Sequence, residues 1–348
     1  MAAAALALTG CGGHAVRPVE QTGAWRVDPP AREDVDAKRL DAAGAWGDRV
    51  LPSLTALLVA RHGRLVFERY YHLGAANQPV PILSITKSVL STLVGIALRE
   101  GRLGTLDLTV GDLFGADVPR GADSRVRSIT LRQLLTMTSG LGSRATDPLG
   151  DGGNAYRTTP NWVRTILGAP LARAPGTSFF YDNGDAHLVS ALLQRATGTT
   201  AAAFARDELF RPLRIEPGPW SADPQGVTDG AAGLQLKPRD LAKLGELYLR
   251  HGRWGGRQIV PAAYVRDATS QRVSAADTGR GLGYGYLWWT FRGAGFPRLF
   301  LAIGSGGQLL IVAPALDAVV VLTSTSEQVA PDLTELELAR RVFDAIRR

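Results

Sequence analysis

The chain has 348 residues, enough for two domains or one large compact domain with an ample core. Hydrophobic residues make up 45% and charged residues 20%, and 40 glycines with 20 prolines stay below low-complexity levels, so disorder, collagen and coiled coil are excluded. The net charge is +7, but only four of the 39 basic residues are lysines and no basic run exceeds two, so nucleic-acid binding has weak support. One cysteine and five scattered histidines predict neither a disulfide nor a Cys-rich zinc site, and we expect no metal and no cofactor.

The N-terminal residues resemble a bacterial lipobox. A short apolar run over residues 2–8 ends in Leu8-Thr9-Gly10-Cys11, and a polar, Pro-containing stretch follows to residue 30. We therefore predict that residues 1–30 are a lipoprotein-type signal and tether, with Cys11 lipidated and the protein extracytoplasmic and membrane-anchored. No Lys or Arg precedes the run, so a frayed Ala-rich terminus is the alternative.

The first elements follow from hydrophobic periodicity. Residues 35–46 predict a surface helix, and two β-prone runs at 54–60 and 65–71 predict an antiparallel hairpin that turns at His62-Gly63. Apolar residues recur at helical spacing over 86–99 and stop at Gly101, which predicts a largely buried helix. Short helical patterns and Gly/Pro-rich loops then alternate to about residue 230, as expected for an inserted helical lobe at about 101–230.

Strand patterns return in the last third of the chain. Helices are predicted at 238–250 and 261–268, strands at 284–291, 299–303, 308–312 and 318–323, and a closing helix at 333–346. The early hairpin and the late strands must share one sheet, since neither is stable alone. The pattern therefore predicts a mixed α/β (α+β) domain over 31–348 with a helical lobe inserted into it.

The first chemical signal opens the buried helix. Ser84 and Lys87 lie three residues apart, so both side chains fall on one helix face and the lysine can take the serine's proton. The reaction needs a partly neutral amine, which desolvation or a nearby cation produces. With 16 serines and four lysines, a chance Ser-x-x-Lys is expected about once in five such chains, so a surface helix stays the alternative. A solvated lysine would be misplaced in so apolar a helix.

A phenol and an amide form the second signal. Tyr181 and Asn183 lie two residues apart on an irregular segment, where a phenol can relay a proton and an asparagine can hold both the lysine and a substrate carbonyl. Alone, this pair is as well explained by a buried tyrosine with a structural hydrogen bond. Competing motifs, namely Gly-x-Ser-x-Gly, His-Glu-x-x-His, a P-loop and a dinucleotide Gly-x-Gly-x-x-Gly, do not occur.

In this order the motifs resemble the serine β-lactamase and penicillin-recognising superfamily. Three further stretches carry the likeness: 129–140, 240–243 and 283–289. They look like the class C-related branch, which includes esterases, D-amino-acid peptidases and 6-aminohexanoate-dimer hydrolases. The resemblance implies a β-lactamase/transpeptidase-like fold, an antiparallel sheet flanked by helices with an inserted helical lobe, and an active site between sheet and lobe.

The third motif departs from the β-lactamase pattern. Where that family usually has Lys or His followed by Gly, this chain has Ile303-Gly304-Ser305-Gly306-Gly307, with no cation. This looks most like the 6-aminohexanoate-dimer hydrolase group, and by that resemblance Ile303 supplies a backbone N–H to an oxyanion hole with Ser84, beside Gly304. A bulged strand and turn explains the glycines equally well.

We therefore predict a serine hydrolase that cleaves a small amide or ester through an acyl-enzyme. Ser84 would attack, Lys87 would deprotonate it, Tyr181 would pass the proton on, and Asn183 would orient Lys87 and the substrate. The alternatives are a penicillin-binding-type D-amino-acid peptidase or carboxylesterase, and a non-catalytic cell-surface binding protein of the same fold. Tyr156 is a candidate lid residue, and the histidines are expected to be structural.

Overall fold

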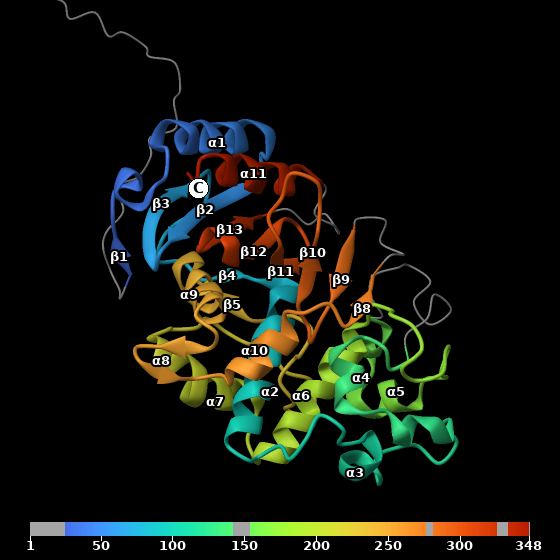
Figure 1. Cartoon of the computed structure of the whole chain (residues 1–348). Helices are drawn as coiled ribbons and strands as arrows, with labels where there is room; N and C mark the ends of the chain where they lie inside the picture. The colour runs from blue at the N-terminus through green and yellow to red at the C-terminus, as the bar shows by residue number, and fades with distance from the viewer. Residues whose placement is uncertain (1–24, 142–153, 276–280, 326–332, 348) are drawn as a thin grey trace, which may run out of the picture.

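The computed structural model describes residues 25–141, 154–275, 281–325 and 333–347. A nine-stranded sheet in the order β1-β3-β2-β13-β12-β11-β10-β9-β8 forms its centre (Figure 1). All neighbouring strands are antiparallel except β1 and β3, and β2 pairs with β13, so the early hairpin and the late strands share one sheet as predicted. The strands are β1 (Arg26–Val27), β2 (Leu54–Arg61), β3 (Arg64–Tyr70), β8 (Val273–Ser274), β9 (Leu282–Tyr284), β10 (Trp289–Phe291), β11 (Leu299–Gly304), β12 (Gln308–Ala313) and β13 (Ala318–Ser324).

Helices cover both faces of the sheet and form the lobe below it in Figure 1. The helices are α1 (Ala37–Val50), α2 (Thr86–Arg99), α3 (Val110–Phe114), α4 (Leu131–Leu135), α5 (Trp162–Gly168), α6 (Asn183–Thr197), α7 (Ala201–Ala205), α8 (Arg211–Leu213), α9 (Pro238–Leu249), α10 (Ala262–Ala268) and α11 (Leu333–Asp344). The buried helix expected over 86–99 is α2, and the closing helix is α11.

Alternation along the central strands divides the core into two. On β2, Leu57 and Val59 face the α1 and α11 side, while Ala56 and Leu58 face the side of α2, α6 and α9. Such alternation is what a strand with two buried faces requires. Helix α2 lies between the sheet and the helical lobe, and this placement carries its first turn to the junction of the two (Figure 1).

Local signals explain where the lobe helices begin. Thr109 with Asp112 and Thr130 with Gln133 form capping boxes at the starts of α3 and α4, each satisfying backbone N–H groups that the helix itself cannot. Asp182 caps α6 through the N–H of residue 184, and Gly198 ends this helix in a left-handed conformation. The lobe is therefore built from short helices with well-marked ends, as the sequence pattern predicted.

Two predicted boundaries were wrong. The single strand expected over 284–291 is the β9–β10 hairpin, because Leu287 adopts a φ of 56° and the N–H of Gly285 bonds the carbonyl of Trp288, which turns the chain. The expected tether to residue 30 also ends earlier. Strand β1 pairs with β3, and the indole of Trp25 donates to the carbonyl of Arg239 (3.0 Å), so the chain joins the fold from residue 25. Cys11 lies outside the described residues.

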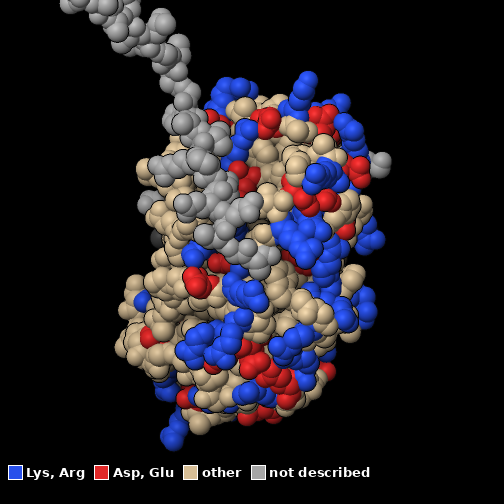
Figure 2. All heavy atoms as spheres, turned by 90° about the vertical axis from the view of Figure 1, so that its left-hand side faces the viewer, with Lys and Arg blue, Asp and Glu red and all other residues tan. Residues whose placement is uncertain are grey.

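The surface in Figure 2 carries both signs of charge. Basic side chains lie next to acidic ones over much of this face, so the positive net charge is not gathered there into one continuous basic surface. Within the described ranges, the structure contains no helix with the length and apolar character that crossing a membrane requires.

Helix α9 packs closely on the sheet at Gly245, which generates a stability prediction. A Cβ at this position would lie 2.5 Å from Val319 Cγ1 and 2.8 Å from Leu310 Cδ1, on β13 and β12. We expect Gly245→Ala to lower the free energy of unfolding by about 1 to 3 kcal/mol, because overpacking a filled core outweighs the helix preference of alanine. Urea unfolding measures the change. Gly104→Ala, where a Cβ meets nothing within 4 Å, is the control. Equal stability of the two variants would contradict the prediction.

Candidate active site

The first turn of α2 presents Ser84 and Lys87 together. A 3-10 turn over Leu83–Ile85 leads directly into the helix, and Leu83 adopts a φ of 48°, a left-handed conformation that is strained for a side chain with a Cβ. Ser84 is half-buried, whereas only 1% of Lys87 is exposed. The predicted pair is therefore brought together, and it does not lie on a solvated helix surface.

The Lys87 amine has three neighbours within hydrogen-bond distance. Nζ lies 2.9 Å from Ser84 Oγ, 2.6 Å from Asn183 Oδ1 and 2.9 Å from the carbonyl oxygen of Ala231. The amide and carbonyl oxygens can only accept, so they take the two hydrogens of a neutral amine. Its lone pair is then left for the Ser84 hydroxyl. This geometry suits a base that removes the serine proton.

Burial makes the amine a base at neutral pH. Removal from water lowers the pKa of Lys87 to about 7, because the charged form loses its hydration. The Asp229 and Asp182 carboxylates oppose this change, and the Arg157 guanidinium supports it. A substantial fraction of Lys87 is therefore neutral near pH 7.

Tyr181 and Asn183 lie on either side of the residue that caps α6. Burial raises the pKa of Tyr181 to about 12, with the hydrogen bond to Ser84 acting in the opposite direction, so the phenol keeps its proton at neutral pH. The ring stacks on Trp289 at a centroid distance of 5.5 Å, and Lys87 Nζ lies 4.9 Å from its centre. The phenol is thus held next to both members of the Ser84–Lys87 pair and can donate a proton there.

Strand β11 passes directly against the turn that carries the serine. A Cβ at Gly304 would lie 2.6 Å from the carbonyl oxygen of Ile82, so only glycine allows this approach. Strand β10 begins at Trp289, which pairs with Leu301. Ile303 therefore lies past the last β10–β11 pair of the described residues. The edge of its backbone that faces the β10 side has no strand partner among these residues. The neighbouring Gln308 is structural, since its amide donates to the carbonyl of Ser324 (2.5 Å).

The structure adds two contacts that the sequence did not indicate. The Ala231 carbonyl holds Lys87, and no side-chain motif could have revealed a backbone acceptor 144 residues away. Trp289 lies against Tyr181, while its neighbour Trp288 is fully buried in the core. No pattern in the sequence indicates that Trp289 contacts Tyr181.

The remaining aromatic and histidine residues of interest are structural. Tyr156 is buried and stacks on His187 (5.9 Å), so the expectation that it forms a lid was wrong. His187 is itself fully buried and lies 3.2 Å from an Asp223 carboxylate oxygen, as expected for a packed residue. His62 forms the hairpin turn at a φ of 49°.

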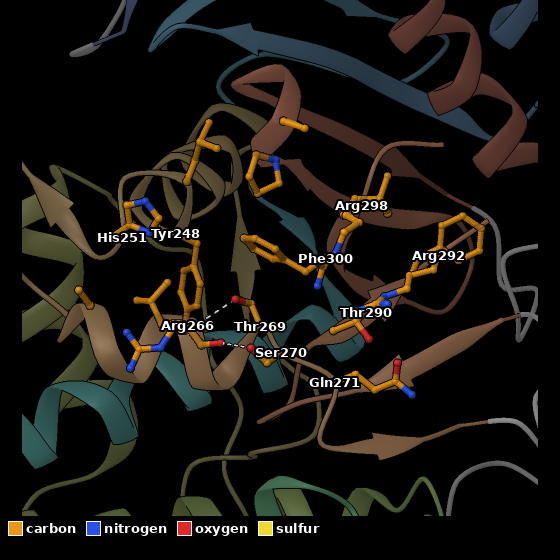
Figure 3. A pocket seen from close by; sticks show the side chains of 17 residues that line it. Tyr248, His251, Arg266, Thr269, Ser270, Gln271, Thr290, Arg292, Arg298 and Phe300 are labelled. Atoms are coloured by element: carbon orange, nitrogen blue, oxygen red, sulfur yellow. Dashed lines mark hydrogen bonds between the residues drawn. The ribbon is translucent and has the colours of Figure 1, made fainter. Parts of the chain in front are cut away.

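A separate cavity of about 790 Å³ lies near α10, the end of β10 and the start of β11 (Figure 3). Its labelled residues include Arg292 and Arg298, whose side chains point toward Thr290. None of the residues that line it belongs to the Ser84–Lys87 site. It therefore plays no part in the chemistry argued for that site.

The chain belongs to the beta-lactamase family, whose profile matches residues 43–344. It is a serine hydrolase of this family with the β-lactamase/transpeptidase-like fold, as the motifs predicted. Among curated relatives, Esterase EstB of Burkholderia gladioli is 32% identical over 274 residues, which cover 71% of this chain and 69% of the esterase.

Solved structures share the fold at low sequence identity. One, from Bacillus anthracis with the provisional name 6-aminohexanoate-dimer hydrolase, has a TM-score of 0.73 and 20% identity and covers 93% of this chain and 88% of that one. Another, EstCE1, described as a hydrolase with promiscuous acyltransferase activity, has a TM-score of 0.73 and 18% identity, covering 89% and 98%. At such identities these likenesses establish the fold.

The lowered pKa of Lys87 predicts how hydrolysis depends on pH. A base that must be neutral to accept the serine proton predicts that kcat/KM falls about tenfold per pH unit below pH 7 and levels off above it. A neutral p-nitrophenyl ester, followed at the isosbestic wavelength of nitrophenol, measures this in the free enzyme. The acid limb is the part of the pH profile in which kcat/KM rises with pH. An acid limb centred near the ordinary pKa of lysine, or a kcat/KM that does not change between pH 5 and 8, would contradict the prediction.

Proposed function

We propose that this protein hydrolyses small carboxylic esters and linear amides through an acyl-enzyme on Ser84. The observation that carries the proposal is the contact between Ser84 Oγ and the desolvated Lys87 amine at 2.9 Å. The similarity to Esterase EstB supports ester cleavage. The fold shared with the Bacillus anthracis structure is compatible with linear amides.

In the first half-reaction, Ser84 Oγ bonds to the substrate carbonyl carbon while its proton passes to Lys87 Nζ. The backbone N–H groups of Ser84 and Ile303 would bind the oxyanion that develops, and Gly304 permits their close approach. Tyr181 then gives its proton to the leaving alkoxide or amine and is reprotonated from Lys87. In the second half-reaction, water loses a proton to Lys87 and its oxygen bonds to the acyl carbon. The bond from that carbon to Ser84 Oγ then breaks, and the proton passes back through Tyr181 to Ser84 Oγ, which restores the free enzyme.

The absence of a cation in the third motif favours substrates without a carboxylate at that end. The segment 303–308 contains no charged side chain, and the amide of its Gln308 is bonded to Ser324. A β-lactam carboxylate would therefore lose one charge-assisted hydrogen bond. We further propose, as a separate point, that the chain is lipidated at Cys11 and lies outside the cytoplasm, on the strength of the lipobox-like sequence alone.

Replacement of the nucleophile tests the central proposal. Ser84→Ala should reduce hydrolysis of a p-nitrophenyl ester of a short acid to the background rate and abolish labelling by a fluorophosphonate probe, because no other group takes the acyl chain. Ser124→Ala, an exposed serine of the 3-10 turn Ser124–Ser128, is the matched control and should behave as wild type. Circular dichroism establishes that both fold. Activity retained by folded Ser84→Ala protein would reject the assignment.

A substrate comparison tests the reading of the third motif. We expect a chromogenic cephalosporin to have a lower kcat/KM than a p-nitrophenyl ester and a linear 6-aminohexanoate dimer. Loss of one charge-assisted hydrogen bond removes about 1.5 to 3 kcal/mol, roughly tenfold to more than a hundredfold in kcat/KM. If the cephalosporin has the highest value of the three, a β-lactamase assignment should replace the one proposed.

A further inference from the structure

An ion pair is connected by hydrogen bonds to the two residues, Asn183 and Ala231, whose oxygens accept from Lys87. Arg157, in the 3-10 turn Ala155–Thr158, donates from both terminal nitrogens to the Asp229 carboxylate at 2.7 and 3.1 Å. The Asp229 side chain is 1% exposed and that of Arg157 is 28% exposed. A carboxylate this deeply buried is stable in its charged form only beside such a partner.

Hydrogen bonds from this pair return to Lys87 by two routes. Asp229 Oδ1 accepts from the backbone N–H of Ala231 at 2.9 Å, and the carbonyl of Ala231 accepts from Lys87. Arg157 Nε donates to Asn154 Oδ1 at 3.0 Å, and this oxygen also accepts from Asn183 Nδ2 at 2.9 Å. Since Asn183 Oδ1 accepts from Lys87, the contacts form a closed ring that begins and ends at Nζ.

The ring determines how each amide is oriented. Arg157 Nε can only donate, so Asn154 must present its oxygen there. That oxygen requires a donor from Asn183, which must therefore present Nδ2 to Asn154 and Oδ1 to Lys87. Without the guanidinium, both amides could turn over and Asn183 could present hydrogens to the amine instead of an acceptor.

The ring also determines the charge around the amine. The groups that face Lys87 are the Asp229 carboxylate from the segment before β5 (Gln235–Leu236), Asp182 and the Tyr181 ring from the start of α6, and Ser84 from its own turn. Arg157 neutralises Asp229, one of the two carboxylates. An unpaired Asp229 would favour the ammonium form, which cannot accept the serine proton.

We propose that Arg157 is a positioning residue for the general base: through Asn154 it holds the Asn183 oxygen on Lys87, and through Asp229 it holds the Ala231 carbonyl and cancels a charge that would keep the amine protonated. This inference rests on the proposed function, because it assumes that Lys87 deprotonates Ser84. It assigns new roles to the side chains of Arg157, Asn154 and Asp229.

Two substitutions with opposite expected effects test the proposal. The readout is the pH dependence of kcat/KM for a neutral p-nitrophenyl ester, together with that of the second-order rate of fluorophosphonate labelling of Ser84. Arg157→Gln should move the acid limb to higher pH by at least about 1 unit, a loss of at least about tenfold at pH 6. Asp229→Asn leaves the guanidinium beside the amine and should move the limb to lower pH. The double variant should return it toward the wild-type position.

Matched variants separate charge from orientation. Arg157→Lys keeps the charge but loses the fork and the Nε bond, so its limb should stay close to that of wild type while the high-pH plateau falls. Asn154→Ala leaves the ion pair and frees the Asn183 amide, with the same expected pattern. Arg164→Gln, which removes an exposed arginine of α5 and changes the net charge equally, should match wild type.

The outcomes distinguish this inference from the proposed function. If wild type neither hydrolyses the ester nor takes the probe at Ser84, the proposed function fails. If wild type is active but Arg157→Gln loses activity equally at every pH, Arg157 is merely structural and the inference is overturned while the function stands. If Arg157→Gln does not fold in a thermal melt, the limb of Asp229→Asn decides, and its failure to move to lower pH overturns the inference.

Discussion

The chemistry proposed for this protein depends on one buried amine. Lys87 can act as a base near neutral pH only because its side chain has left water, and it can leave water only because oxygens from α6 and from residue 231 replace the lost hydration. Desolvation and hydrogen bonding act together here. The first makes the neutral amine stable, and the second leaves its lone pair facing Ser84.

The arrangement of the sheet, α2 and the helical lobe buries that amine. Helix α2 lies between the sheet and the helical lobe, so its first turn meets β11 on one side and the start of α6 on the other. Close approach at Gly304 brings the β11 backbone to the serine turn. Gly230 has the same function on the lobe side, where a Cβ would lie 2.1 Å from the Ala186 carbonyl. Small residues at these two contacts let three segments converge on one side chain.

The charged groups around the site come from the lobe, and they act on Lys87 in opposite directions. The Asp229 carboxylate favours the charged form of the amine, and the Arg157 guanidinium paired with it acts in the opposite direction. The phenol of Tyr181 stays protonated for the same reason that Lys87 becomes neutral, because burial disfavours the charged form of each. Burial thus keeps Tyr181 protonated as a proton donor and makes Lys87 neutral as a proton acceptor, because the charged phenolate and the charged ammonium are both disfavoured away from water.

The sequence by itself determined the order of most helices and strands and the identity of Ser84, Lys87, Tyr181 and Asn183 as candidates, because each of these depends on spacing within a few residues or one turn. The shared sheet followed from a different argument, that neither the early hairpin nor the late strands are stable alone. It did not determine that 282–291 is a hairpin, since that depends on a positive φ at Leu287. Only the tertiary structure decided that the Lys87 amine is removed from water and that it donates to the Ala231 carbonyl. The same is true of the ring of hydrogen bonds that Arg157 and Asp229 complete around it. Those contacts join segments that lie far apart in the chain, and desolvation is a property of the assembled neighbours that no local pattern encodes.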